Sequence, residues 1–222
     1  MTIAAATRPF DAGDHACAVY SSRAQLVRLV SRFLAEGLER YEHCWYVGPR
    51  LDGRAIGAGL RRRAVDVDRQ VRDGALRFLL PGDVYLVGGE FQPVRTDRIF
   101  SDAITQARLD GFRGLRVAAD VSWASSIDSG TERLIAYEAH AQAGFFGAPV
   151  IGLCLYHRRR LPLHVLNGAL LTHPLTTAAR GHAMANPFYD GEVAALPSAH
   201  DREVTSKLHA LTNLTRRSVR RR

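Results

Sequence analysis

Apolar positions along this chain follow two different periodicities. Some short runs are almost continuously apolar, which is typical of strands that are buried on both faces. Between them, apolar residues recur every three to four positions, as Leu26, Val30 and Phe33 do, which indicates one face of a helix. The runs predict strands over residues 15–20, 43–47, 76–80, 115–121 and 150–156, and the spaced pattern predicts helices over residues 22–40, 51–63, 96–109, 131–144 and 161–171.

The order of these elements indicates the fold class. Strands that alternate with helices favour an α/β protein of three layers, with a mainly parallel central sheet flanked by helices. A further strand is expected within residues 176–184. We expect a disordered lead over residues 1–12, one domain over residues 13–190, a linker over 191–200 and a basic amphipathic helical tail over 201–222.

The composition is that of a globular protein, with 222 residues of which 46% are hydrophobic and 23% charged. No apolar run approaches the roughly 18 residues that a membrane-spanning helix needs, and the N-terminus lacks a signal-peptide pattern. A cytoplasmic protein without a membrane partner is therefore expected. Three cysteines, Cys17, Cys44 and Cys154, are too few and too scattered for a disulfide framework.

The net charge of +8 is concentrated at the C-terminus. Residues 201–222 hold seven basic and two acidic side chains, so the preceding residues are only weakly basic. Nucleic acid is expected as a partner only through this tail, which could equally be a solvated terminus. Its apolar face could dock onto the domain or onto a second copy of the chain. The arginines concerned are Arg216, Arg217, Arg220, Arg221 and Arg222.

The chain contains a single lysine, Lys207, which lies in this tail. A phosphate-binding loop of the Walker type places a lysine on the phosphates, and Schiff-base chemistry needs a lysine in its site. Both are excluded for the domain. Since no G-x-S-x-G, H-E-x-x-H or C-x-x-C motif occurs either, we expect a protein that is not an enzyme.

Seven short motifs follow one another in the order of a known family. They are Gly13–Tyr20 (GDHACAVY), Phe33-Leu34-x-x-Gly37-Leu38, Ala119–Trp123 (ADVSW), Tyr137-Glu138, Leu153-Cys154-x-Tyr156, His173-Pro174 and Asn186-Pro187-x-Tyr189. Over residues 13–190 the chain resembles the MEDS family, the methanogen/methylotroph sensory domain of dichloromethane-regulator-like proteins. The resemblance implies a fold related to the RecA/KaiC ATPases. It also implies a domain that senses small organic ligands, in proteins coupled to transcription factors, histidine kinases or sigma-factor regulators.

Two positions depart from the family pattern. His157 stands where an aspartate is usual, and Val121 where a methionine is usual. The resemblance draws attention to further motif positions, Glu138, His173, Asn186 and Tyr189. For His173 and Asn186, each before a proline, a chain reversal is the simpler interpretation. No output domain is recognisable, so we expect a separate signalling or transcription-regulatory protein as partner.

A RecA-like arrangement would place a phosphate-binding loop directly after residues 15–20. The segment found there, residues 21–25, contains no glycine and no lysine, and offers Arg23 and a helix N-terminus. Asp120 would stand where such proteins hold Mg²⁺, or would instead cap the turn after its strand. We therefore expect a RecA/KaiC-like fold without a functional phosphate-binding loop. Binding of ATP without efficient hydrolysis is an alternative.

Ligands of open α/β sheets bind beyond the carboxyl ends of the strands. Aromatic and polar side chains gather at these ends, which suits a small and mostly apolar organic ligand with a few polar contacts. The predicted ligand-binding residues are Tyr20, Ser22, Arg23, Asp120, Trp123, Tyr156 and His157. Trp123 could alternatively belong to the core.

Zinc and haem are alternative ligands. His15 and Cys17 share one face of a predicted strand, and in a RecA-like order Cys154 lies on the neighbouring strand. Imidazole and thiolate bind zinc and haem iron, although buried cysteines also pack as small hydrophobic residues.

The sequence thus predicts a non-catalytic sensor of a small organic molecule that reports to a transcription, sigma-factor or kinase partner. One alternative is a nucleotide-binding protein that oligomerises. The other is a haem or zinc sensor that uses His15, Cys17 or Cys154.

Overall fold

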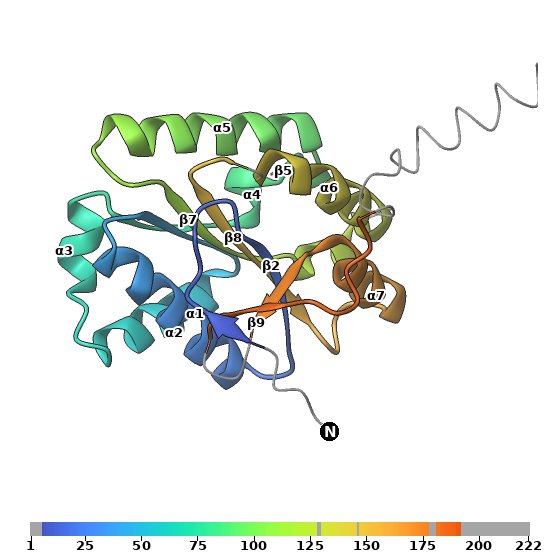
Figure 1. Ribbon diagram of the computed structural model, residues 1–222, viewed down its shortest axis with the longest axis horizontal. Helices are drawn as coiled ribbons and strands as arrows, with labels where there is room; N and C mark the ends of the chain where they lie inside the picture. Colours follow the sequence, from blue (N-terminus) through green and yellow to red (C-terminus); the bar gives the residue numbers. More distant parts are fainter. Residues whose placement is uncertain (1–5, 128–129, 146, 178–180, 192–222) are drawn as a thin grey trace, which may run out of the picture.

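A central sheet with helices on both faces organises the chain (Figure 1). The computed structural model describes residues 6–127, 130–145, 147–177 and 181–191. The strands of the main sheet, in spatial order, are β1 (Thr7–Arg8), β10 (Ala183–Ala185), β9 (Leu175–Thr177), β2 (His15–Tyr20), β8 (Val150–His157), β7 (Leu115–Asp120), β3 (His43–Val47) and β4 (Leu76–Leu79). The helices are α1 (Arg23–Glu39), α2 (Arg50–Arg61), α3 (Val67–Arg72), α4 (Pro81–Val84), α5 (Pro93–Leu109), α6 (Gly130–Phe145) and α7 (Leu163–Thr172), with a 3-10 turn at Ser122–Ser126.

The sheet is parallel from β9 to β4, and β10 and β1 extend it antiparallel. Its middle strands are buried on both faces, as parallel strands covered by helices must be. Cys17 of β2 is paired in register with Cys154 of β8, which is paired with Ala119 of β7 on its other side. The predicted α/β class with a mainly parallel sheet is therefore confirmed.

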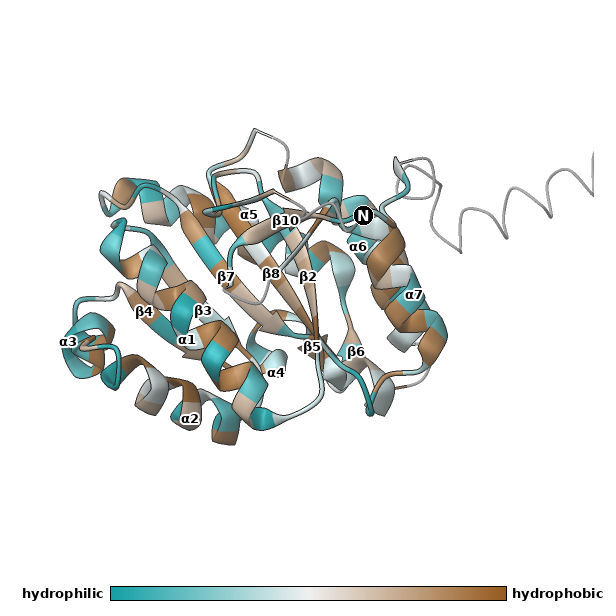
Figure 2. Cartoon of the chain, turned by 60° about the horizontal axis from the view of Figure 1, so that its bottom comes forward, coloured by the Kyte–Doolittle hydropathy of each residue, from teal (hydrophilic) through white to brown (hydrophobic). Residues whose placement is uncertain are grey.

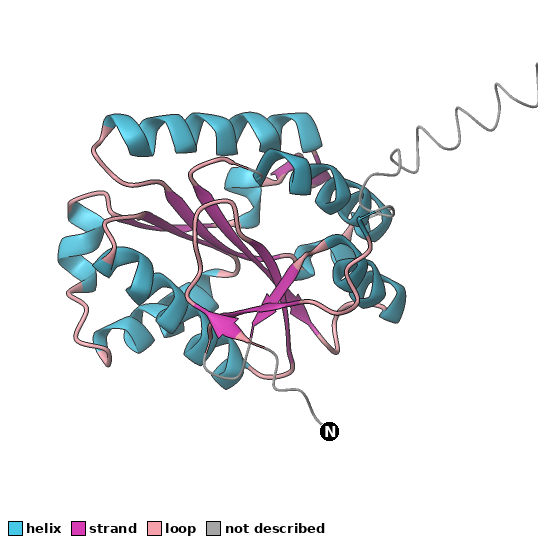
Figure 3. Ribbon diagram, viewed as in Figure 1, coloured by secondary structure: helices cyan, strands magenta, loops and turns pink. Residues whose placement is uncertain are grey.

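Side chains that alternate along the strands divide the core into two halves. Val117 and Ala119 of β7 pack towards α5, α6 and α7, whereas Ala118 packs towards α1 and α2. Figure 3 shows these helices on either side of the sheet, and Figure 2 shows that the strands between them are the hydrophobic centre of the molecule. No helix in the described residues is long and apolar enough to cross a membrane.

The first helix follows β2 almost at once. Ser22 is its N-cap, and the Ser22 hydroxyl accepts a hydrogen bond from the backbone N–H of Gln25 at 3.3 Å. Only Ser21 and Ser22 separate Tyr20, the last residue of β2, from Arg23, the first residue of α1. A connection of two residues is shorter than the loop with which a Walker-type site binds phosphate.

The prediction of a disordered lead over residues 1–12 is wrong for part of that segment. Residues Thr7–Arg8 form β1, which pairs with β10. Phe10 is fully buried, with its ring 5.2 Å from that of Phe33 in an edge-on contact. Burial of the Phe10 ring and the pairing of β1 with β10 both stabilise the ordered segment. The predicted tail over residues 201–222, and residues 192–200 of the predicted linker, lie outside the described residues.

Several short elements have no counterpart in the periodicity. These are α3, α4 and a hairpin of β5 (Leu86–Val87) and β6 (Glu90–Phe91). Gly88 and Gly89 both have positive φ, at 59° and 86°, as a type I′ hairpin turn of two residues requires. Elements of two to six residues are too short to show a period, and the glycine pair was the signal for the hairpin alone.

Candidate functional site

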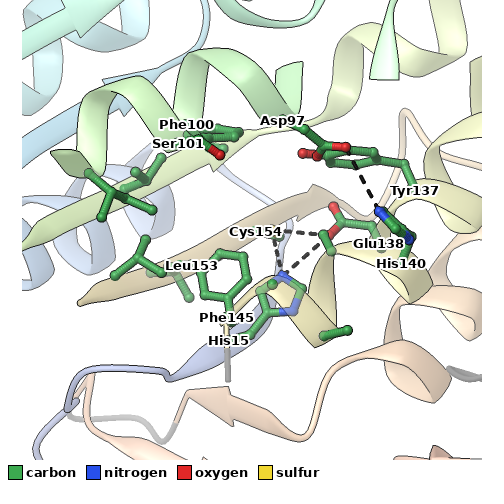
Figure 4. A pocket seen from close by; sticks show the side chains of 18 of the residues that line it. His15, Asp97, Phe100, Ser101, Tyr137, Glu138, His140, Phe145, Leu153 and Cys154 are labelled. Carbon is green, nitrogen blue, oxygen red and sulfur yellow. Dashed lines mark hydrogen bonds and ion pairs between the residues drawn. The ribbon is translucent and has the colours of Figure 1, made fainter. Parts of the chain in front are cut away.

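A cavity of about 500 Å³ lies on one face of the sheet, against α5 and α6 (Figure 4). Strands β2, β7 and β8 also contribute to its wall. Much of the lining is apolar and includes Phe100, Ile104, Val117, Ala119, Ala141 and Phe145. Polar groups stand at its two ends. The exposed His140 and the half-exposed Asp97 lie towards solvent, whereas the buried His15, Glu138 and Cys154 lie deep in the protein.

Glu138 of α6 is the centre of the deep end. It is 3% exposed, and its carboxylate accepts hydrogen bonds from the Tyr156 hydroxyl at 3.2 Å and from Cys154 Sγ at 3.6 Å. His15 Nε2 and His173 Nε2 lie 3.3 Å and 3.5 Å from Glu138 Oε2. One carboxylate thus faces two imidazoles, a thiol and a phenol in the interior.

Burial and contacts act in opposite directions on the pKa values of this group. Burial alone would raise the pKa of Glu138, but its contacts with the imidazoles of His15 and His173 hold it well below its usual range. Burial, helped by the neighbouring His173, lowers the pKa of His15. Burial raises the pKa of the Cys154 thiol well above its usual value, and the charge of Glu138 raises it further. The cluster therefore combines an ionised carboxylate with a neutral His15.

The structure brings together two of the three residues predicted to bind a metal. His15 Nε2 lies 3.5 Å from Cys154 Sγ. Cys17 is the register partner of Cys154 and is buried, but it stands outside the four-residue cluster of described ligating groups, which is His15, Glu138, Cys154 and His173. Burial raises the pKa of Cys17 to about 12, as expected for a thiol in the core.

Tyr156 lies elsewhere than predicted, and the structure also gives the positions of Asn186 and Tyr189. Tyr156, predicted at the carboxyl edge of the sheet, is fully buried and turned to Glu138. Its spacing of two from Cys154 on one strand was the available signal, since such residues share a face. Asn186 indeed marks a chain reversal. Its Nδ2 donates to the backbone oxygens of Leu170 and His173, both at 2.7 Å, and so holds the end of α7. Tyr189 is partly exposed and is not part of the cavity lining.

At the carboxyl edge of the sheet, Tyr20 and Asp120 form a buried pair. The Tyr20 hydroxyl donates to Asp120 Oδ2, and Asp120 Oδ1 accepts from the backbone N–H of Ser122 at 2.8 Å. Both carboxylate oxygens are thus engaged in fixing β2 and the turn after β7, as the capping interpretation expects. The ring of His157 contacts Tyr20 edge-on, with centroids 4.9 Å apart.

Arg23 and Trp123 do not converge on this pair. The Arg23 guanidinium lies 2.8 Å from the Asp52 carboxylate and donates to the backbone oxygen of Leu51, so its charge is engaged with α2. Trp123 belongs to the core, stacked on Tyr85 with ring centroids 5.1 Å apart. Its indole N–H has no hydrogen-bond partner within the described part of the chain. A second hollow, of about 580 Å³, lies beyond the carboxyl ends of β3 and β4 and is lined in part by Gly48, Arg50 and Asp83.

Solved structures identify the class of fold. The KaiC-like protein PH0186 from Pyrococcus horikoshii OT3 matches with a TM-score of 0.50 and 8% identity, over 77% of this chain and 80% of that chain. An uncharacterized protein, PH0321 from Pyrococcus horikoshii, solved in complex with an unknown peptide, matches with a TM-score of 0.53 and 13% identity, over 82% and 86%. The chain has a RecA/KaiC-like fold, as predicted.

The sequence comparison identifies the family within that class. Residues 14–174 match the family model of MEDS, the methanogen/methylotroph, DcmR sensory domain. The chain belongs to the MEDS family. A curated relative is the transcriptional repressor DcmR of Methylorubrum extorquens (strain DSM 6343 / CIP 106787 / DM4), which is 26% identical over 161 residues. The match covers 72% of this chain and 58% of the repressor, so this chain spans little more than half of that relative. Family and relative together indicate a regulatory sensor role.

Proposed function

We propose that this chain is a non-catalytic sensor that binds a small, mostly apolar organic molecule in the cavity between the sheet and helices α5 and α6. On binding, it reports to a separate transcription-regulatory or signalling protein. The observation that carries the proposal is the cavity itself, since about 500 Å³ lies within the range of small-molecule sites. The sensory family and the repressor relative support the regulatory part.

The lining supports an apolar ligand with one polar end. Aromatic and aliphatic side chains form most of the wall, which also includes Ser101, and carboxylate and imidazole groups lie at its two ends. An apolar wall binds water only weakly, so an apolar ligand displaces that water at little cost. The exposed end carries the ion pair of His140 and Asp97, with Nε2 and Oδ2 3.9 Å apart, between α6 and α5.

The same two helices connect the cavity to the surface. Ser101 and Ile104 of α5, and Ala141 and Gly144 of α6, line the cavity. A ligand that touches both helices would favour one spacing between them over another, and would alter the outer surface that a partner contacts. A sensor needs no chemical step for this response.

The sequence predicted the ligand-binding site at another place, the carboxyl edge of the sheet. Tyr20, Asp120 and His157 gather there, but the hydroxyl of Tyr20 and the carboxylate of Asp120 already bind each other. The neighbouring hollow beyond β3 and β4 has a more polar lining. We favour the α5/α6 cavity because its wall matches an apolar ligand. The tail as a contact to nucleic acid, and the cytoplasmic location, stay predictions.

Filling the cavity tests the proposal. Benzene, toluene and cyclohexanol, used as small apolar probes, should raise the thermal unfolding midpoint of the unaltered chain. A probe at about 100 times its Kd stabilises by about 2.7 kcal/mol, or about 5–10 °C for a domain of this size. Ala141→Phe should abolish the shift, because the new ring occupies the cavity.

Val94→Phe is the matched control, since Val94 lies on α5, is 76% exposed and is not part of the cavity lining. This variant should respond like the unaltered chain. A shift that persists in Ala141→Phe would place the probe elsewhere, and no shift with any of the three probes would remove the cavity as the sensing site.

A further inference from the structure

Four side chains with metal-ligating atoms meet at the deep end of the cavity, from four different parts of the fold. His15 begins β2, Glu138 lies on α6, Cys154 lies on β8 and His173 directly follows α7. All four are buried, and one ligating atom from each lies within 4.8 Å of the others. Figure 4 shows three of them, His15, Glu138 and Cys154, pointing toward one another from separate elements.

The separations between these atoms match the edges of a coordination tetrahedron. Bonds of about 2.0–2.3 Å around a tetrahedral zinc ion place the ligand atoms roughly 3.3–3.6 Å apart. Glu138 Oε2 lies 3.3 Å from His15 Nε2, 3.5 Å from His173 Nε2 and 3.6 Å from Cys154 Sγ. Cys154 Sγ lies 3.5 Å from His15 Nε2. Four of the six edges therefore already have the length that zinc would impose.

Hydrogen bonds on the far side of each imidazole direct its lone pair inward. His173 Nδ1 lies 2.8 Å from the backbone oxygen of Ala169, an atom that only accepts, so Nδ1 carries the proton. His15 Nδ1 lies 3.0 Å from Gln142 Oε1 and is placed to donate in the same way. In the neutral rings, both Nε2 atoms then present lone pairs. Protein metal sites orient their histidines in this manner.

The inward lone pairs leave an electrostatic conflict that a cation resolves. His173 Nε2 is buried and has no hydrogen-bond partner in the described part of the chain, and it faces a carboxylate oxygen across 3.5 Å. Two lone pairs at that distance repel unless a proton or a metal ion lies between them. A carboxylate and a thiolate beside two neutral imidazoles sum to two negative charges, which a divalent ion neutralises in the interior.

We propose that His15, Glu138, Cys154 and His173 bind a divalent transition-metal ion of the zinc class. Two imidazoles, one thiolate and one carboxylate are the donor set of tetrahedral zinc rather than of Mg²⁺ or Ca²⁺, which take oxygen ligands. Binding forms four metal–ligand bonds and releases the thiol proton of Cys154 to solvent. The Tyr156 hydroxyl, on the other oxygen of Glu138, fixes the carboxylate from outside. This site lies at the deep end of the proposed sensing cavity, but it does not require that an organic molecule binds there.

Cobalt titration of the full chain, after removal of bound metal by a chelator, tests the site. Co²⁺ should bind at one ion per chain, with the visible bands of tetrahedral cobalt and a thiolate-to-cobalt charge-transfer band. Cys154→Ser should remove the charge-transfer band, and His173→Gln should weaken Co²⁺ binding at least about tenfold. Zinc should displace the cobalt, and purified protein from zinc-replete cells should contain zinc.

Cys17→Ser is the matched control, because Cys17 is the register partner of Cys154 but lies outside the cluster. It should keep both the bands and the affinity. The unaltered chain decides the question even if a variant fails to fold, and circular dichroism monitors the fold throughout. A folded, unaltered chain that binds neither Co²⁺ nor Zn²⁺ would show that a proton, not a metal, joins His173 and Glu138. A charge-transfer band that depends on Cys17, or haem iron that copurifies with the chain, would equally overturn the assignment.

Discussion

Arg116 shows how single charges are accommodated inside this protein. Its fully buried guanidinium donates to the Glu42 carboxylate and to the backbone oxygen of Phe33 at 3.2 Å, and lies 4.6 Å from the centre of the Phe33 ring. A buried charge without such partners would cost several kcal/mol. Glu138, on the opposite face of the sheet, instead accepts hydrogen bonds from the Tyr156 hydroxyl and from Cys154 Sγ.

His43 offers a test at the residue scale. Its Nε2 accepts a 3.0 Å hydrogen bond from the indole N–H of Trp45, which requires a neutral ring. Burial, together with the charge of Arg77, lowers the pKa of His43 in the folded protein. The unfolded chain then binds a proton at a higher pH than the folded chain. The free energy of unfolding should therefore fall as the pH drops from about 7 to about 5.

Urea unfolding at three pH values in this window measures the effect. His43→Gln, whose amide can still accept from Trp45, should have a smaller pH dependence than the unaltered chain. His140→Gln is the control, since the side chain of His140 is 76% exposed, and its pH dependence should be unchanged. The same slope in all three proteins would show that His43 does not couple folding to pH.

At the scale of the elements, close approach decides how α1 sits on the sheet. A Cβ added at Gly37 would lie 2.5 Å from Arg116 Cδ and 2.7 Å from Cys44 Sγ. Glycine in the last turns of α1 thus lets the helix backbone meet β3 and β7 directly. Glycine has a low helix propensity, and the helical period does not require it at position 37. The contact explains its presence.

Gly37→Ala should lower the free energy of unfolding by about 1–3 kcal/mol, because overpacking exceeds the gain in helix propensity. Gly144→Ala is the matched helical control. A Cβ at Gly144 meets nothing within 4 Å, so this variant should be stabilised by up to about 1 kcal/mol. Urea denaturation compares the two. A Gly37→Ala protein as stable as Gly144→Ala would mean that α1 moves freely to accommodate the methyl group.

At the scale of the whole molecule, the fold is RecA/KaiC-like, but the carboxyl edge of its sheet lacks the loop that binds phosphate in a Walker-type site. The connection from β2 to α1 is two serines, and a phosphate cradle needs a longer run of inward backbone N–H groups with a cation. Arg23 is engaged with Asp52 and Leu51, and Asp120 with Tyr20 and Ser122. Both residues are thus already engaged with protein groups, which supports the proposal of a sensor that turns over no nucleotide.

ATP with Mg²⁺ should accordingly leave the thermal unfolding midpoint of the full chain unchanged, and no phosphate should be released. A phosphate-release assay and a thermal scan measure both, with a known ATPase as positive control. Release of phosphate that is lost in Asp120→Asn would restore the nucleotide-dependent alternative and contradict the sensor proposal.

The sequence by itself determined the local and repetitive features of this protein. Apolar runs and helical spacing placed the strands β2, β3, β4, β7 and β8 and the long helices, because burial on one or two faces leaves a regular pattern of apolar residues. The ordered motifs identified the family, and the expected strand order placed Cys154 on the strand next to that of His15 and Cys17. Elements of a few residues, such as the hairpin after α4, leave no such period.

Only the tertiary structure decided which groups share a site. His15 and His173 are far apart in the chain, and Glu138 reaches them from a helix whose rotation is set by all its packing contacts. The alternation of side chains along β8 puts Cys154 and Tyr156 on one face of the sheet. It does not determine which helix covers that face. The cavity likewise arises where the side chains of α5 and α6 fail to fill the space above β7 and β8. A void is a property of the whole packing, and no single segment of the sequence contains it.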